Sequence, residues 1–176
     1  MSYDDSKSFA EALVSNESTL PEHVQIFAPF IGGWDLLVRW FDEQGKVTRT
    51  ERGEWYFSWV LEGRGLQDVW IVPPREQRQT GALYEYGTSI RIYDPELDAW
   101  RSTWIGPMHH VVRTFTARKV GEQVVLQTTP DIEPVMRWSF YDIETSAFAW
   151  RNEIQVHAQW RTQQTFEARR RLDRAG

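Results

Sequence analysis

Two adjacent histidines, His109 and His110, are the clearest candidates for acid–base chemistry in this chain. Imidazole changes its charge near neutral pH, so histidine serves readily as a general acid or base. Neighbouring residues on a regular strand point to opposite faces, and only one of the two would then face an interior site. If Gly106 and Pro107 keep the stretch in a loop, both histidines reach the mouth of a cavity. The alternative is a polar strand start that faces water.

Four further charged residues interrupt apolar strand patterns: Arg91, Arg137, Arg151 and Glu153. One face of residues 147–154 carries Ala147, Ala149, Arg151 and Glu153, and the other carries Phe148, Trp150, Asn152 and Ile154. This pattern favours aromatic residues inside and charges outside, in cross-strand pairs. In the alternative, the small alanine face turns inward and leaves space for a ligand. Arg91, Arg151 and Glu153 would then contact that ligand, with Glu153 available for proton transfer.

Aromatic residues are abundant, with 10 Trp, 9 Phe and 6 Tyr in 176 residues. Residues 55–61 alternate so that Trp55, Phe57 and Trp59 share one face of an extended strand. We expect Trp55, Trp59, Trp104 and Trp138 to face the interior, either as a packed core or as the walls of a ligand site. In a small barrel these two surfaces coincide.

Other kinds of site lack their motifs. The chain has no Cys, which excludes disulfides, thiol nucleophiles and thiolate metal sites. It has no His-x-His or His-Glu-x-x-His spacing, no Gly-x-Ser-x-Gly elbow and no phosphate-binding glycine loop. We therefore expect no metal site and no cofactor.

The elements that position these residues are strands, almost without interruption after Gly33. The expected strands are 34–41, 47–61, 66–72, 80–84, 88–93, 99–105, 110–118, 123–128, 134–141, 147–156 and 160–170. Short turn sequences separate them, as in an antiparallel meander, and a long meander usually closes because closure removes its unpaired edges. The sequence predicts a mainly β fold, a closed antiparallel barrel of about eight to ten strands.

The first 30 residues differ from the rest. A short helix is expected over residues 4–16, with Phe9 and Leu13 on its apolar stripe, and a second helical turn over 22–30. We interpret the chain as a single domain: a helical extension over 1–30, a barrel over 31–170 and a tail over 171–176.

Composition limits the partners and the compartment. The net charge is -5, and the one basic cluster, Arg169 to Arg171, is expected to belong to a solvated tail rather than to a nucleic-acid site. No apolar run approaches the ~20 residues that span a bilayer, and no secretory signal is evident. We expect a cytoplasmic protein that binds neither nucleic acid nor membrane, and we leave a homodimer open.

Residues 30–34, Phe-Ile-Gly-Gly-Trp, open the first expected strand. They resemble the Gly-x-Trp signature of the calycin superfamily, which includes lipocalins and fatty-acid-binding proteins. The layout of residues 30–170 is similar to that of bacterial lipocalin-like proteins of unknown function and of nitrobindin-type barrels. The resemblance implies a calycin-like barrel in which Trp34 plugs one end. It also implies that a basic residue of the last strand, Arg169 or Arg170, packs over that ring.

Two features depart from these families. Lipocalins are normally secreted and often disulfide-bonded, whereas this chain shows no signal segment and no Cys. A haem site of the nitrobindin type needs a proximal histidine near the C-terminus. His157 is the candidate by position, but its neighbours do not match that context, so we do not carry the role over.

Two functions are compatible with these residues. The first is an intracellular lipocalin-like barrel that binds a small hydrophobic or aromatic molecule in its Trp-rich interior. The alternative is a cofactor-independent enzyme (a lyase, isomerase or cyclase) that uses the same pocket, with His109, His110 or Glu153 as acid or base. The residue pattern alone does not decide between them.

Overall fold

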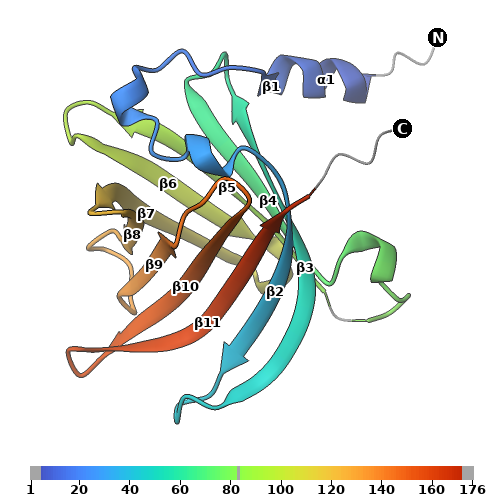
Figure 1. Cartoon of the computed structure of the whole chain (residues 1–176), viewed down its shortest axis with the longest axis vertical. Helices are drawn as coiled ribbons and strands as arrows, with labels where there is room; N and C mark the ends of the chain where they lie inside the picture. Colours follow the sequence, from blue (N-terminus) through green and yellow to red (C-terminus); the bar gives the residue numbers. More distant parts are fainter. Residues whose placement is uncertain (1–4, 83, 172–176) are drawn as a thin grey trace.

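The computed structural model describes residues 5–82 and 84–171, and within them ten antiparallel strands form a closed barrel (Figure 1). The strands are β2 (Gly32–Phe41), β3 (Val47–Val60), β4 (Gly65–Val72), β5 (Glu85–Asp94), β6 (Ala99–Gly106), β7 (Val111–Val120), β8 (Gln123–Thr128), β9 (Met136–Tyr141), β10 (Ala147–Val156) and β11 (Gln159–Arg170). Each strand pairs with the next along the chain, and β11 pairs with β2 to close the ring. The predicted fold class is confirmed.

Side-chain alternation decides which residues face the barrel interior. On β10, Phe148 and Trp150 are buried in the core, so Ala147 and Ala149 lie on the outer face. Glu54 and Tyr56 on β3 likewise face outward, between core residues such as Trp55. The alternative in which the alanine face of β10 turns inward is therefore wrong, because the large rings bury more apolar area in that position.

One expected strand is not formed. Residues 80–82 form a turn and an irregular segment, with Gly81 at φ +79°, and residue 83 lies outside the described residues. The chain instead enters β5 at Glu85 and continues to Asp94, so the strands expected over 80–84 and 88–93 are one loop and one long strand. The turn interrupts the pairing because a positive φ does not fit an extended strand.

The N-terminal segment lies across one end of the barrel, where Figure 1 shows it in blue. Helix α1 (Asp5–Leu13) buries none of its residues, and Phe9 is 69 % exposed. After the two-residue strand β1 (Val14–Ser15), which pairs with β3, the 3-10 turns η1 (Glu22–Val24) and η2 (Ala28–Phe30) replace the expected second helical turn. Among the described residues, no helix is both long enough and apolar enough to cross a membrane.

Trp34 closes this end of the barrel. Its ring is fully buried, its indole N–H donates to the carbonyl oxygen of Phe30 at 2.7 Å, and the guanidinium of Arg170 lies 4.2 Å from the ring centroid. Arg170 also donates to the carbonyl oxygens of Ile31 at 2.7 Å and Pro29 at 2.9 Å. The expected packing of a basic residue from the last strand over Trp34 is confirmed, and the residue is Arg170.

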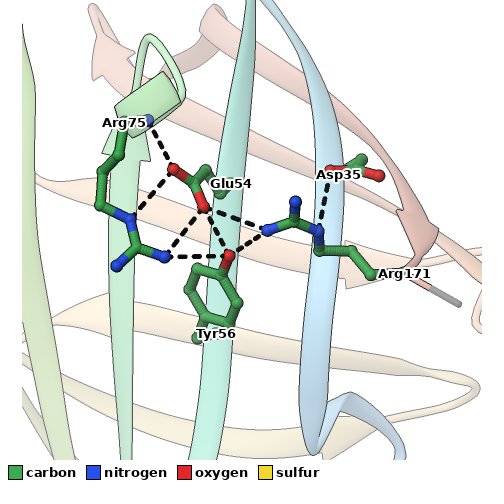
Figure 2. Close-up of polar contacts among 5 residues, drawn as sticks. All are labelled: Asp35, Glu54, Tyr56, Arg75 and Arg171. Atoms are coloured by element: carbon green, nitrogen blue, oxygen red, sulfur yellow. Dashed lines mark hydrogen bonds and ion pairs between the residues drawn. The ribbon is translucent and has the colours of Figure 1, made fainter. Parts of the chain in front are cut away.

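Arg171 follows the last strand and holds a polar cluster on the outer face, drawn in Figure 2. Glu54 is 4 % exposed, and its carboxylate accepts hydrogen bonds from Arg75, Tyr56 and Arg171. Arg171 also pairs with Asp35 at 3.2 Å. Arg170 and Arg171 are thus bound to the barrel and not part of a solvated tail, while residues 172–176 lie outside the described residues.

The cluster changes the acidity of Glu54. Burial raises the pKa of this carboxyl, but the hydrogen bonds from Arg75 and Tyr56 outweigh burial and hold the pKa at about 2. The pKa of Glu54 is lower in the folded protein than in the unfolded chain. The charged carboxylate of Glu54 therefore stabilises the fold.

We expect Trp34→Ala to lower the free energy of unfolding by about 3–5 kcal/mol, because it removes a fully buried ring. Urea and thermal unfolding measure the loss. Trp160→Ala is a matched control, since Trp160 is only partly buried, and it should cost much less. Equal losses for the two variants would show that Trp34 does not hold the end closed.

We expect Glu54→Gln to lower the free energy of unfolding at pH 7 by an amount on the order of 2 kcal/mol, reduced because Arg75 is half exposed. The stabilisation by Glu54 is fully present above pH 4.5 and is lost as the pH falls towards 2. Urea unfolding at several pH values should therefore show the difference between wild type and variant narrowing in that window. If the difference in unfolding free energy between wild type and variant stays constant as the pH falls, the low pKa assigned to Glu54 is wrong.

Candidate functional site

A cavity of about 470 Å³ occupies the barrel interior at the end opposite Trp34. Trp34 lies near the start of β2, whereas Trp40, near the end of the same strand, lines the cavity. The exposed residues Met108 and His109 also line it, so the cavity reaches the surface at this end. Six of the ten tryptophans form its walls: Trp40, Trp55, Trp70, Trp104, Trp138 and Trp150.

Ring packing holds these walls in place. Trp150 stacks on Phe166 with the ring centroids 4.2 Å apart, and Trp70 stacks on the same ring at 5.5 Å. Trp138 lies 5.6 Å from Trp150 and 5.9 Å from Trp104. Such an aromatic array buries much apolar area and presents flat faces to the interior.

Gly87 of β5 makes room for one wall. A Cβ atom at this position would lie 2.2 Å from the ring of Trp104, which is too close for any real side chain. The absence of a side chain at Gly87 therefore lets the Trp104 ring lie directly against the backbone of the neighbouring strand. The position of this wall depends on the glycine.

The indole N–H groups differ between the two ends of the barrel. At the closed end, Trp34 donates to Phe30 and Trp100 donates to the carbonyl oxygen of Val24 at 2.8 Å. Around the cavity, four indole nitrogens are buried without a hydrogen-bond partner among the described residues: those of Trp55, Trp70, Trp138 and Trp150. A buried indole N–H usually finds an acceptor, so the cavity walls are held by ring packing rather than by fixed hydrogen bonds.

A few polar side chains stand among these rings. Glu85 and Tyr86 come from the start of β5, His109 from the turn before β7, and Arg113 from β7. Amide side chains enter from β10 and β11: Asn152, Gln163 and Gln164. The arrangement can therefore bind an apolar body against the rings and orient polar atoms of a ligand.

Glu85 and His109 are close enough to influence each other. Burial raises the pKa of Glu85, while the charges of His109 and Arg49 act in the opposite direction. Arg49 lies 3.6 Å from the Glu85 carboxylate, and the Glu85 side chain is 17 % exposed. A largely buried carboxyl beside a histidine is a suitable arrangement for proton transfer.

The structure brings four of the sequence-predicted site residues to this cavity: Trp55, Trp104, Trp138 and His109. His110 is exposed, with φ +54°, and does not line the cavity. Trp59 is buried at the closed end, where its ring lies 6.5 Å from that of Trp100.

Arg91 lies inside the barrel but between the cavity and the closed end. Its guanidinium is 2.6 Å from the carboxylate of Asp68, and the two side chains are 1 % and 0 % exposed. It also lies 4.9 Å from the ring centroid of Phe27. Because Asp68 neutralises Arg91 within the core, the structure gives this arginine a core ion pair and no place in the cavity lining.

Arg151 and Glu153 are also absent from the cavity lining. Glu153 accepts a hydrogen bond from Arg137 of β9 at 2.9 Å and pairs with Arg151 at 3.2 Å. Arg137 stacks on Trp160, and Arg151 lies over Tyr141. These contacts form the cross-strand charge cluster that the sequence pattern favoured over a ligand site.

Glu85 and Arg113 line the cavity although the sequence analysis did not single them out. Glu85 shares its strand face with Gly87, Ser89 and Arg91, all of which are buried. If the strand predicted over residues 88–93 had been started at residue 85, alternation would have placed the Glu85 carboxyl on the inner face of the barrel. The same alternation on β7 puts Arg113 on the face of the buried residues Phe115 and Ala117.

The described residues assemble no cluster of metal ligands, and His157 lies away from the cavity. Within 5–82 and 84–171, no three His, Asp or Glu side chains come together as metal ligands would. His157 is exposed in the turn between β10 and β11, with φ +48°, and does not line the cavity.

Comparisons with known proteins identify the fold. The crystal structure of Rv2717c from M. tuberculosis superposes with a TM-score of 0.55 and 11 % sequence identity, over 87 % of this chain and 99 % of that one. No protein-family model and no curated protein matches the sequence. At this level of identity the similarity concerns the barrel fold alone.

We expect Arg91→Met to lower the free energy of unfolding by about 3–5 kcal/mol, because Asp68 would keep a buried charge without a partner. Adding Asp68→Leu should recover most of the loss, and denaturant unfolding of both variants measures it. A folded Arg91→Met protein that has lost ligand binding would instead place Arg91 in the site.

Proposed function

We propose that this protein is a calycin-like barrel that binds a small apolar or aromatic molecule in its interior cavity. The observation that carries the proposal is the coincidence of a cavity of about 470 Å³ with walls formed by six tryptophans. Small-molecule sites usually have volumes of about 300–1,000 Å³, apolar walls and a few convergent polar groups. This cavity has all three properties.

The difference between the two barrel ends also supports binding. The closed end is filled by fully buried rings such as Trp34, Phe27 and Phe30. At the cavity end the rings pack against one another around an open space, and four buried indole nitrogens have no hydrogen-bond partner among the described residues. Walls held by ring packing can adjust to a flat ligand without breaking a hydrogen bond.

Glu85 supports a second candidate function, a cofactor-independent lyase, isomerase or cyclase. Its carboxyl is largely buried, lines the cavity and lies near His109, while Arg49 holds it in place. Burial raises the pKa of the Glu85 carboxyl, which makes its carboxylate a stronger base than an exposed one. In this version Glu85 takes the role that the sequence analysis gave to Glu153, and His109 is its partner.

We expect the neutral fluorescent probe N-phenylnaphthylamine to bind with one-to-one stoichiometry and to quench tryptophan emission. Trp104→Ala should weaken binding about tenfold or more, because it removes one wall of the cavity. His110→Ala is the control, since His110 is exposed outside the lining and should leave the dissociation constant unchanged. Absence of probe binding, or equal effects of both variants, would contradict the binding function.

Glu85→Gln separates the two candidate functions. A binding protein should keep most of its affinity for the neutral probe in this variant. An enzyme should convert members of a panel of aromatic compounds, followed by mass spectrometry, and should lose turnover with the same substitution.

A further inference from the structure

We propose that the cavity selects ligands that carry an anionic group on an aromatic or apolar body, and that Arg113 is the residue that binds this group. The inference rests on the proposed binding function and adds the chemical class of the ligand. It depends on the orientation of Arg113, on its lack of a counter-charge and on how the other charges near the cavity are balanced.

Arg113 points towards the interior. Its neighbour Val112 is 64 % exposed and faces outward, whereas Phe115, two positions beyond Arg113, is 1 % exposed. Alternation along β7 therefore places Arg113 on the inner face. There it lies opposite Trp104 of β6, which also lines the cavity.

Arg113 has no counter-charge among the described residues. It takes part in no hydrogen bond, ion pair or stacking contact within residues 5–82 and 84–171, although it is partly buried. The other interior arginine, Arg91, is neutralised by Asp68 at 2.6 Å. The guanidinium nitrogens of Arg113 keep contact with solvent, and no carboxylate of the described residues approaches them. An anionic group of a ligand can therefore bind there through charge-assisted hydrogen bonds without breaking an existing ion pair.

Glu85 does not serve as this counter-charge. It is the one carboxylate among the described residues of the cavity lining, and it is paired with Arg49 at 3.6 Å. The charges that act on Glu85 are those of His109, Arg49 and Glu51, and Arg113 is not among them. The cation paired with Glu85 is thus Arg49, which also pairs with Glu51 at 2.6 Å, and neither carboxylate is paired with Arg113.

The surroundings of Arg113 define what such a ligand would look like. The tryptophan walls favour a flat, apolar body, and the amide groups of Gln163 and Gln164 provide further hydrogen-bond donors in the lining. The guanidinium fork matches a planar carboxylate or a sulfonate, to which it can donate two parallel hydrogen bonds. An aromatic acid fits this combination.

Two fluorescent probes that share one aromatic skeleton test the inference. Anilinonaphthalene sulfonate carries an anionic group, and N-phenylnaphthylamine lacks it. Titrations with wild-type protein should show that the sulfonate binds at least about tenfold more tightly, as a charge-assisted hydrogen bond implies. Arg113→Gln should remove this preference without changing the affinity for the neutral probe, and Arg113→Lys should restore part of it.

Arg52→Gln is the matched control, because Arg52 is exposed on the outer surface and its loss changes the net charge by the same amount. It should leave both affinities unchanged. If the neutral probe fails to bind wild type, the binding function itself is wrong. If the neutral probe binds but the sulfonate is not preferred, or Arg113→Gln and Arg52→Gln act alike, the anion site is wrong and the binding function stands.

Discussion

The pairing of the last strand with the first is the constraint on which the rest of this structure depends. Without the contact between β11 and β2, the ten-strand meander would have two open edges and no enclosed interior. Arg170 secures this junction from the last strand, because its guanidinium covers Trp34 and donates to the chain that leads into β2. A cation–π contact of this kind gains strength when water is excluded from it.

Closure at this junction makes the two ends of the barrel different. The N-terminal segment can lie across only one end, because η2 runs directly into β2 next to Trp34. The indole groups at that end find backbone acceptors in the segment, and the rings pack without space between them. At the other end, no segment within residues 5–82 and 84–171 supplies acceptors to the four buried indole nitrogens, and the interior is hollow. The cavity thus lies at the barrel end that the segment before β2 does not cover.

The charged side chains on the outside of the barrel are paired differently from those in its interior. On the outer face, Glu54 pairs with Arg75 and Arg171, and Glu153 pairs with Arg137 and Arg151. Inside, Asp68 neutralises Arg91 and leaves no free charge in that part of the core. Each of these clusters pairs a carboxylate with one or two arginines and serves the fold. Arg113 departs from this pattern at the cavity wall, which is why it points to a ligand rather than to stability.

The sequence by itself determined the β class and the closed barrel, because these depend on local properties, whereas the role of Trp34 was implied by the resemblance of residues 30–34 to the calycin signature. Alternation of Trp55 and Phe57, the turn residues between strands and the Gly-Trp step at residues 33–34 can all be read along the chain. It also supplied four residues of the cavity lining: Trp55, Trp104 and Trp138, which lie on strands, and His109, which lies in the turn after Gly106. The partners of Arg91 and Glu153 were decided by the tertiary structure alone, because Asp68 and Arg137 meet them across neighbouring strands. Only the three-dimensional fold placed Glu85 and Arg113 at the same cavity, since they lie 28 positions apart (113 − 85) on strands that are not adjacent. Alternation assigns a residue to a face, but the register between strands decides which charges are paired, and register is a property of the closed sheet.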